Sequence, residues 1–528
     1  MEVSVPDAAG SAAAKVLIGQ PGSFIGVDAG SIQLLCMVTA ARVSNEHAGG
    51  NGARTIGTGR PDRLLDAIVV GTIKPDGGFE RGADALPTVG AQAFALSAQA
   101  LERIYASQAT GTFSMGKLSQ ARSQDARISL DALLSRHAAI LGQTGAGKSW
   151  TVASILQKLG QMPQASVVLL DLHGEYQNAF GDYATYIKTA DLELPYWLMN
   201  CEELIDMCIE RHESAAPLQI AKFKELLQDA KLTFQENRNL NIPMITVDTP
   251  VYFEFSKLFE EMQRLDTEVV LVNLVRTHGP LYGHFTRTIA RLQSRLNDRR
   301  FDLIFNPKTY KTTASMEPLL RKILGEEPSS KNLTVLDLSQ VPFEVRPSVI
   351  SLILRCLFDF AYWYKRRHGV AYPLSVFCDE AHTYLNDADP THKPSRISAE
   401  RIAKEGRKYG ISLTVISQRP REVSSTILSQ CNSFVCLRIS HPDDQQHVRG
   451  LLPDAMRGIT SALSTLRQGE AILVGDAIVM PTRVLIDPPD PKPDSRDVSF
   501  SARWGKPHQA VDVAKVLEAW RKQQAKGG

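Results

Sequence analysis

The feature that most constrains this chain is a glycine-rich stretch that joins a predicted strand to a predicted helix. Residues 142–149 read GQTGAGKS, follow an apolar run at 137–141 and lead into a plausible helix at 151–156. Glycines let the backbone wrap closely around phosphates, and a helix N-terminus presents unpaired N–H groups to an anion. The stretch therefore predicts a phosphate-binding loop within an α/β fold.

The same loop predicts which residues bind a nucleotide. Lys148 would reach the β- and γ-phosphates of ATP, and the Ser149 hydroxyl would ligate Mg²⁺. A glycine-rich turn that merely precedes Lys-Ser would look alike, but the flanking strand and helix argue against that reading. The expected nucleotide-binding residues are Gly142, Gln143, Thr144, Gly145, Ala146, Gly147, Lys148, Ser149, Trp150 and Asp171.

Length and composition indicate a multidomain globular protein. A chain of 528 residues exceeds one ordinary domain, and its net charge of +2 gives no global basic field for nucleic acid, although a local groove could still be positive. Seven cysteines form no CxxC pair, which favours reduced, buried thiols. No signal peptide and no apolar run long enough to span a membrane is present, so we expect a cytoplasmic protein.

The pattern of apolar and polar residues changes along the chain. Residues 1–14 are small and polar, as in a flexible tail, and 15–125 hold short apolar runs between glycine-rich turns, which favours a small β-barrel or sandwich. Apolar runs typical of buried parallel strands then follow at 137–141, 167–171, 333–337, 375–379, 413–417 and 434–438. Residues 196–325 are polar and mostly helical in pattern, so they predict a helical insertion that splits an α/β core at 126–195 and 326–440. Residues 441–528 form the remaining C-terminal part.

Two acids and an amide follow two of these strands. Asp379 and Glu380 end one apolar run, where one carboxylate can hold the Mg²⁺ shell and the other can polarise an attacking water. Acids at a helix N-terminus are common, yet their pairing with the phosphate loop favours catalysis. Gln418 closes the next run in Ser-Gln-Arg-Pro, where its amide could hydrogen-bond the γ-phosphate and the water; the alternative is a simple turn ended by Pro420.

Three arginines are candidates for a finger that neutralises transition-state charge in a neighbouring subunit. Arg401 and Arg407 belong to a basic helical stretch, and Arg136 precedes the first core strand. A solvated or salt-bridged arginine is an equally good reading of each one. The densest basic stripe, at residues 287, 291 and 295, could contact phosphate but more often forms a solvated face.

A second acidic motif ends the run at 167–171. Asp171 and Glu175 would face the crevice at the carboxyl ends of the strands, toward nucleotide or DNA. His173 lies between them, but no second His or Cys stands at ligand spacing, which argues against a dedicated metal site there.

These motifs and their order resemble the HerA branch of the HerA/FtsK superfamily of ring-forming ATPases. The resemblance spans roughly residues 20–490 and rests on HAAILGQTGAGKS (137–149), DLHGEY (171–176), LPYW (194–197), DEAH (379–382), GRKYG (406–410) and SQRP (417–420). It implies an N-terminal β-barrel similar to the HAS barrel, a RecA-like motor core, a helical insertion and a C-terminal brace.

The resemblance also implies a function and residue roles. A homo-hexamer would thread duplex DNA through its pore, with a NurA-like nuclease or another effector docked on the barrel. Lys148 and Ser149 would bind nucleotide and Mg²⁺ with Asp379, Glu380 would activate water, and Gln418 would sense the γ-phosphate. Arg407 or Arg401 would be the finger in trans, with Arg136 a second candidate; Lys404 stands where relatives often carry arginine.

Other functions remain open at this stage. The ring could be an ATP-gated assembly and regulatory platform for an effector enzyme in anti-phage defence. A conjugative or secretion ATPase is disfavoured because no membrane anchor is visible. The string DEAH also occurs in RNA helicases, but the accompanying motifs and their order are wrong for those proteins.

Overall fold

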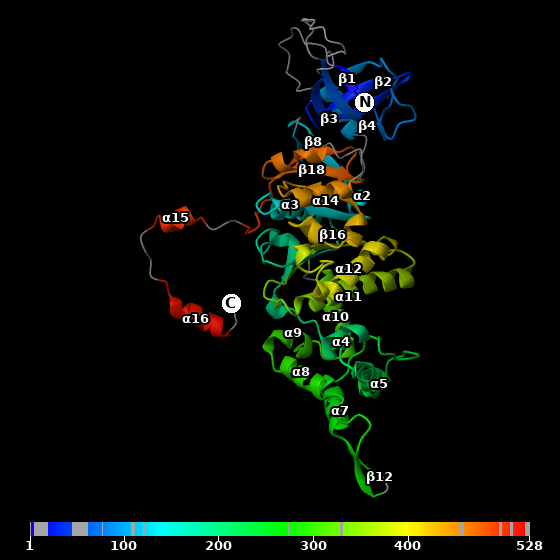
Figure 1. Cartoon of the computed structure of the whole chain (residues 1–528), viewed down its shortest axis with the longest axis vertical. Coiled ribbons are helices and arrows are strands. Elements are labelled where there is room, and N and C mark those ends of the chain that lie inside the picture. The colour runs from blue at the N-terminus through cyan, green and yellow to red at the C-terminus, as the bar shows by residue number, and fades with distance from the viewer. Residues whose placement is uncertain are drawn as a thin grey trace, which may run out of the picture. The chain divides into compact units, whose positions relative to one another are not determined.

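An eleven-stranded mixed sheet organises the centre of the chain, and seven of its strands run parallel (Figure 1). The computed structural model describes residues 2–4, 20–44, 62–76, 78–106, 111–119, 122–272, 274–327, 331–452, 459–495, 499–506 and 511–522. The parallel strands, in spatial order, are β11 (Ala184–Ile187), β14 (Leu333–Asp337), β10 (Val167–Asp171), β15 (Leu374–Cys378), β16 (Ile411–Ser417), β9 (His137–Leu141) and β17 (Cys431–Cys436). The six predicted strands thus coincide with observed parallel strands. Their residues are almost all buried, as continuous apolar runs require.

Four antiparallel strands extend this sheet beyond β17. They are β18 (Glu470–Gly475), β19 (Thr482–Ile486), β7 (Thr112–Leu118) and β8 (Asp125–Ser129), paired in that order. The sequence placed residues 112–118 in the N-terminal domain and 470–486 in a C-terminal brace, but the structure places both in the core sheet. The added strands satisfy the backbone groups at the edge of β17, which would otherwise stay unpaired.

The N-terminal region forms a second, antiparallel sheet. It contains β1 (Glu2–Ser4), β2 (Phe24–Ala29), β3 (Ile32–Ser44), β4 (Asp62–Ile73), β5 (Phe79–Arg81) and β6 (Ala93–Ala95), followed by α1 (Ala98–Ala106). The order is β1-β4-β3-β2-β6, with β5 on β4, so the pairings among the described residues leave the sheet open. The expected closed barrel is therefore not confirmed. Residues 2–4, expected in a tail, pair with β4, and residues 5–14 lie outside the described part.

A salt bridge links this N-terminal sheet to the core sheet. Arg81 ends β5, and its guanidinium lies 3.2 Å from the carboxylate of Asp476, in the turn between β18 and β19. The Arg81 Nε–H also donates to the Val479 carbonyl at 2.9 Å. Because both strands of that turn belong to the core sheet, the N-terminal sheet is anchored to the core by this ion pair and by hydrogen bonds from the Arg81 side chain to backbone carbonyls.

Helices pack on the core sheet and set the position of its loops. They are α2 (Leu130–Leu134), α3 (Lys148–Gly160), α11 (Arg346–His368), α12 (Lys393–Glu405), α13 (Ser425–Ser429) and α14 (Pro442–Leu451). The longest, α11, has Pro347 in its first turn, basic residues in its last turn and left-handed Gly369 at its end, as helix signals predict. Among the helices of the described residues, none combines the length and the hydropathy that crossing a membrane requires.

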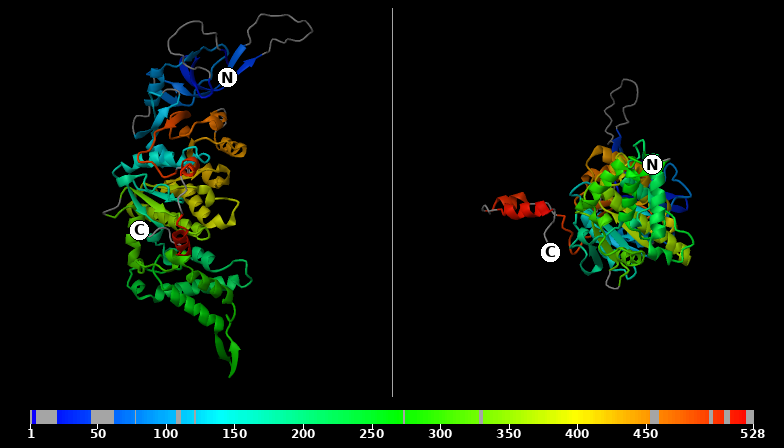
Figure 2. Two further views of the ribbon diagram at one scale, coloured as in Figure 1. Left: turned by 90° about the vertical axis from the view of Figure 1, so that its left-hand side faces the viewer. Right: turned by 90° about the horizontal axis from the view of Figure 1, so that it is seen from below.

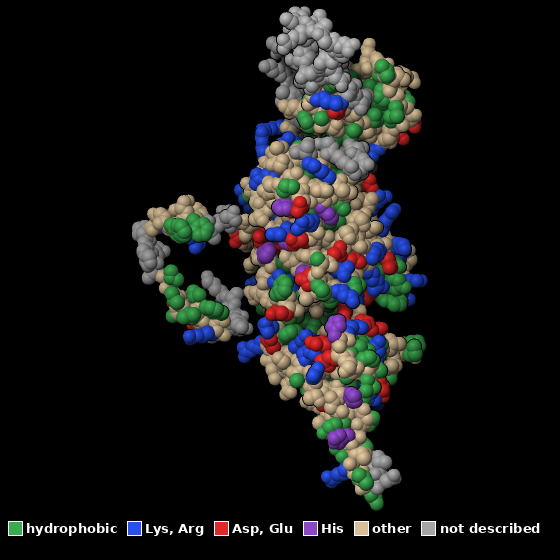
Figure 3. Space-filling model, viewed as in Figure 1, with side chains coloured by type: hydrophobic (Ala, Val, Ile, Leu, Met, Phe, Trp, Pro, Cys, Tyr) green, Lys and Arg blue, Asp and Glu red, His purple; other side chains and the backbone are tan. Residues whose placement is uncertain are grey.

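The segment between β11 and β14 is mainly helical. It comprises α4 (Cys201–Cys208), α5 (Ala216–Thr233), α6 (Gln235–Arg238), α7 (Phe255–Thr267), α8 (Thr286–Leu296), α9 (Asp302–Phe305) and α10 (Met316–Leu324). Large buried side chains, including Trp197, Phe223, Phe253 and Phe285, fill its interior. Between α7 and α8 a hairpin of β12 (Val269–Val272) and β13 (Val275–His278) projects from the helices (Figure 2), and hydrophobic side chains are visible at its tip (Figure 3).

Residues 494–528 form a separate unit. Its described elements are α15 (Phe500–Trp504) and α16 (Val513–Lys522). Trp504 and Trp520 are largely exposed.

Candidate nucleotide-binding site

The predicted phosphate loop lies at the carboxyl end of β9 and is fixed by both neighbouring strands. The Gly142 N–H donates to the Ser417 carbonyl at 3.1 Å, and the Gln143 N–H donates to the Arg438 carbonyl at 2.9 Å. Gly147 has a φ of 104° and caps α3, and a Cβ there would lie 3.1 Å from the Gly469 nitrogen. Only glycine fits that conformation and that space, so the loop can curl before the helix begins.

Lys148 and Ser149, the first residues of α3, carry the polar groups of the loop. The Lys148 side chain is buried and donates a long hydrogen bond, 3.4 Å, to the Gln143 carbonyl. Burial lowers the pKa of Lys148, while the charges of Glu380, Asp379 and Glu175 oppose that shift. The Ser149 hydroxyl donates to Glu175 Oε2 at 2.7 Å.

The two predicted acids follow β15 directly. Asp379 is buried, and burial, followed by the charges of neighbouring carboxylates, raises its pKa well above the ordinary value. Glu380 adopts a left-handed conformation with a φ of 46°, which is unusual for a residue with a side chain. Burial raises the pKa of Glu380, and Lys148 opposes this. Backbone strain of this kind clusters at active sites, where it aims a side chain.

His382 lies against Glu380 as a neutral group. Burial lowers the pKa of His382 to about 4. Its Nδ1 lies 3.3 Å from Glu380 Oε2 and 3.4 Å from Ser417 Oγ. Glu380 Oε2 accepts no hydrogen bond from any described residue, so this carboxylate oxygen keeps a lone pair available.

Gln418 follows β16, the strand between β9 and β15, and lies beside the phosphate loop. Its Oε1 accepts a hydrogen bond from the Thr144 hydroxyl. The two side chains line an open pocket of about 340 Å³ together with Gln143, Arg419, Arg421, Glu422, His441 and Asp444. The structure therefore places Lys148, Ser149, Asp379, Glu380 and Gln418 near one another.

Asp171 and Glu175, the two acids of the second acidic motif, make different contacts. The Asp171 carboxylate accepts the backbone N–H groups of His173, Gly174, Glu175 and Tyr176 at 2.8–3.3 Å. Both of its oxygens are thus engaged by the turn, and Glu175 is the residue that contacts the phosphate loop. Sequence reasoning did not single out Glu175 as the partner of Ser149; its spacing from Asp171 in DLHGEY is the signal that could have done so.

The donor set fits a magnesium ion held together with a nucleotide. Burial lowers the pKa of Lys148, and the negative charges of three carboxylates, those of Glu380, Asp379 and Glu175, oppose this shift. No group of three or more His, Cys, Asp or Glu in the described residues forms a metal cage by itself. Magnesium commonly takes only one or two protein oxygens, with phosphates and water completing its shell. Ser149 and Asp379 supply oxygens of that kind.

Trp150, expected to contact the nucleotide, is partly covered by a C-terminal segment. The Lys492 ammonium lies 5.2 Å from the centre of the indole ring. On the same helix, the Gln157 side chain donates to the Pro491 carbonyl at 2.8 Å and accepts from the Asp490 N–H at 3.0 Å. The segment after β19 is therefore bound to the helix that begins in the phosphate loop.

The three candidate finger arginines do not contact their own phosphate loop. Arg136 and Arg407 precede β9 and β16, so they lie at the amino edge of the parallel sheet, whereas the loop lies at the carboxyl edge. Arg136 forms an ion pair with Asp476. Arg401 stacks on Phe358 at 4.2 Å. Arg407 is exposed, and no hydrogen bond or ion pair joins it to the described residues.

The basic stripe on α8 is partly neutralised. Arg291 lies 3.0 Å from Glu210 and 3.2 Å from Glu213. Arg295 is half-buried against the Phe301 ring, with its guanidinium carbon 5.6 Å from the ring centre. This arrangement favours a structural face over a phosphate-binding one.

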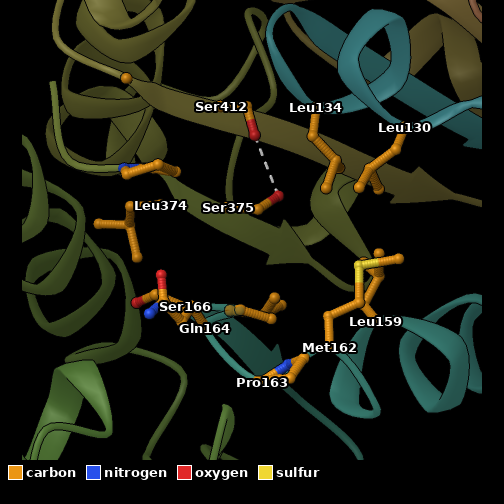
Figure 4. A pocket seen from close by; sticks show the side chains of 14 residues that line it. Leu130, Leu134, Leu159, Met162, Pro163, Gln164, Ser166, Leu374, Ser375 and Ser412 are labelled. Carbon is orange, nitrogen blue, oxygen red and sulfur yellow. Dashed lines mark hydrogen bonds between the residues drawn. The ribbon is translucent and has the colours of Figure 1, made fainter. Parts of the chain in front are cut away.

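A second cavity, of about 550 Å³, lies at the amino edge of the sheet and is mainly apolar (Figure 4). Leu130 and Leu134 of α2 and Leu159 and Met162 near the end of α3 line it. Ser375 and Ser412 hydrogen-bond to each other at 3.0 Å on its floor. Because the phosphate loop is at the opposite edge, this cavity is separate from the nucleotide site.

A phosphate loop after β9, two acids after β15 and an amide after the strand between them together define a P-loop ATPase. Residues 113–357 match the family described as the central domain of the helicase HerA. The DNA double-strand break repair helicase HerA of Sulfurisphaera tokodaii is 28% identical over 418 residues, covering 78% of this chain and 76% of that protein. The HerA of Saccharolobus solfataricus is 25% identical over 410 residues, covering 74% and 75%. The chain is accordingly a P-loop ATPase that is similar to HerA helicases over about three quarters of its length.

Solved structures resemble the chain more distantly. VirB4 of Thermoanaerobacter pseudethanolicus aligns with a TM-score of 0.47 at 15% identity, covering 72% of this chain and 97% of VirB4. The bacterial conjugative coupling protein TrwB aligns with a TM-score of 0.42 at 13% identity, covering 71% and 89%. At these scores neither structure bears on what the chain does.

Proposed function

We propose that this ATPase is a homo-hexameric DNA translocase or helicase that moves duplex DNA and works with a partner nuclease, NurA-like, or with another effector. Relatives over most of its length are named DNA double-strand break repair helicases, which supports DNA as the substrate. The observation that carries the proposal is the division of the site between two edges of one sheet. Lys148, Glu380 and Gln418 meet at the carboxyl edge, while Arg136 and Arg407 lie at the amino edge.

Each residue at the carboxyl edge has a chemical task in ATP hydrolysis. Lys148 and the N-terminus of α3 would hold the phosphates, and Ser149 and Asp379 would hold Mg²⁺, which neutralises developing phosphate charge. Glu380 would accept a proton from the attacking water, since its strained backbone aims a carboxylate with a raised pKa at the loop. Gln418 would orient the water and report the γ-phosphate through its contact with Thr144.

The position of the candidate finger arginines, away from their own phosphate loop, favours a ring-shaped assembly. An arginine finger must reach the γ-phosphate, and Arg407 cannot do so within its own chain because it lies at the far edge of the sheet. Placed against the carboxyl edge of a second copy, the same residue would complete that copy's site. A head-to-tail contact of this kind repeats around a closed ring, and Arg407, exposed and without a described partner, is our first choice for the finger.

The decisive experiment measures ATP hydrolysis with and without duplex DNA. We expect duplex DNA to stimulate the wild-type protein, and both Lys148→Ala and Glu380→Gln to abolish turnover. Glu225→Gln, on an exposed ion pair of α5, is the matched control and should hydrolyse ATP normally. Normal turnover in either site variant would refute the assignment of the site.

A second measurement tests the ring. Electron microscopy of the wild-type protein with an ATP analogue should show hexamers, and Arg407→Ala should lose hydrolysis while keeping ATP binding. Mixing inactive Arg407→Ala with inactive Glu380→Gln should restore part of the activity, because some interfaces then pair an intact finger with an intact base. A monomer that hydrolyses ATP alone would contradict the proposal.

A further inference from the structure

Glu175 is an acidic residue of the site that lies outside the phosphate loop, in the turn after β10. Its Oε2 accepts a hydrogen bond from the Ser149 hydroxyl at 2.7 Å, and its side chain is half-buried. We infer that Glu175 is a positioning residue: it orients the Ser149 hydroxyl so that the oxygen lone pairs face a magnesium ion bound with the nucleotide. This inference rests on the proposed function, because it refines how the same site holds its metal.

The chemistry of a hydroxyl makes such a partner necessary. A serine hydroxyl has one proton to donate and two lone pairs to offer. When its oxygen ligates a metal through a lone pair, the proton must point elsewhere and needs an acceptor. A carboxylate acceptor also draws the proton away from the oxygen and so makes that oxygen a better ligand. Glu175 Oε2 stands at hydrogen-bond distance from that proton.

The fold holds Glu175 rigidly in this position. The turn that carries it closes on the buried Asp171 carboxylate through four backbone N–H groups, including that of Glu175 itself at 3.3 Å. β10, which ends at Asp171, is paired with β15, which ends just before Asp379. The Asp379 N–H also donates to the Leu170 carbonyl at 3.3 Å. Glu175 and Asp379 are thus presented by adjacent strands to the start of α3.

The negative charge of Glu175 should have opposite effects on the binding of the metal and on the binding of a metal-free nucleotide. Its carboxylate lies 2.7 Å from the Ser149 hydroxyl, so its negative charge adds negative potential where the metal would bind. Negative potential attracts a divalent cation and repels the phosphates of a metal-free nucleotide. Removing the charge should therefore weaken magnesium-dependent binding and leave metal-free binding unchanged or stronger, an outcome that simple damage to the fold would not produce.

The test measures binding of a fluorescent ATP analogue by the full chain, first in EDTA and then along a magnesium titration. For Glu175→Gln we expect the half-saturating magnesium concentration to rise by about 10–100-fold, the range found for partners that orient metal ligands. Glu175→Asp, which keeps the charge on a shorter side chain, should recover part of this loss. Glu225→Gln is again the control and should behave as wild type.

A double variant tests whether Glu175 acts through Ser149. Ser149→Ala alone should weaken the magnesium dependence, and adding Glu175→Gln should cause only the smaller further loss that removal of a negative charge produces, because the hydroxyl to be oriented is already gone. Fully additive effects, or an unchanged magnesium titration in Glu175→Gln, would overturn the inference. If Glu175→Gln lost binding in EDTA as well, its role would be structural and the inference would also fail.

Failure of the proposed function would look different. A wild-type protein that binds no nucleotide, with or without magnesium, would refute the site itself. Binding that is intact in EDTA and responds to magnesium equally in wild type and Glu175→Gln would refute only the role of Glu175.

Discussion

Protonation of His137 should loosen the sheet that carries the nucleotide site. His137 begins β9, the strand that leads into the phosphate loop, and its Nδ1 accepts the N–H of Leu413 in β16 at 3.0 Å. Burial lowers the pKa of His137 from 6.5 to about 4, despite an opposing backbone hydrogen bond with Ala403. A protonated Nδ1 could no longer accept from Leu413, so one hydrogen bond between the loop strand and the Gln418 strand would be lost in addition to their backbone pairing.

The size and the sign of the effect follow from the two pKa values. Between pH 6.5 and about 4 the unfolded chain binds a proton at His137 that the folded chain does not, so stability falls as the pH falls through this window. At 1.36 kcal/mol per unit, the full shift corresponds to about 3 kcal/mol, of which about 2 kcal/mol is lost by pH 5. Above pH 6.5 both states are neutral at this site, and the contribution of His137 no longer changes.

Hydrogen exchange of the β9 and β16 amides provides the assay, because it reports local opening without requiring the whole chain to unfold at once. After correction for intrinsic rates, protection in these strands should fall about 30-fold between about pH 7.5 and pH 5, the equivalent of about 2 kcal/mol. In His137→Asn the amide oxygen can still accept from Leu413 but does not titrate, so most of this fall should disappear. His382 also titrates near pH 4, yet it is present in both proteins and cancels in the comparison. Equal pH dependence in the two proteins would refute the reasoning.

Three further predictions concern the site and its support. Gln418→Ala should lower the ATPase turnover number by about 100-fold with ATP binding retained, as expected when one polar group aimed at the transition state is removed; loss of binding would contradict a role confined to hydrolysis. Because burial raises the pKa of Glu380 above 4.5, the acid limb of the turnover–pH profile should have its midpoint above that value, and a midpoint at or below it would exclude Glu380 as the base. Trp197→Ala should destabilise the helical segment by about 3–5 kcal/mol, since Trp197 is fully buried and its Nε1–H donates to the Tyr310 carbonyl at 3.0 Å; a thermal transition equal to that of wild type would show that the cavity collapses.

Six of the seven parallel strands could be predicted because each is a nearly continuous apolar run, whereas β11, which contains Thr185 and Tyr186, was not. Runs such as residues 167–171 are apolar at every position but the last, and only strands buried on both faces tolerate that pattern. The antiparallel half could not be found in this way. β7 and β19 become neighbours through pairing between the two ends of the chain, with Leu118 opposite Val484, and no local pattern encodes a partner so distant.

The same distinction holds for the site. Glu380 and Gln418 were predictable because each closely follows a recognisable strand, and Lys148 because it ends the phosphate loop after such a strand; parallel strands bring their carboxyl ends together. The Ser149–Glu175 hydrogen bond was not, because it depends on how Asp171 folds the intervening turn. The placement of Asp476 beside Arg136 was equally hidden, since the two residues are 340 positions apart in the chain.

Asp476 receives two arginines that belong to different parts of the molecule. Arg81 comes from the N-terminal sheet, and Arg136 immediately precedes the strand that leads into the phosphate loop. A force applied to the N-terminal sheet would therefore be transmitted through Arg81 and Asp476 to Arg136, which immediately precedes β9. Because both arginines share this one carboxylate, neutralising Asp476 would weaken the contact of the N-terminal sheet and the anchorage of β9 at the same time.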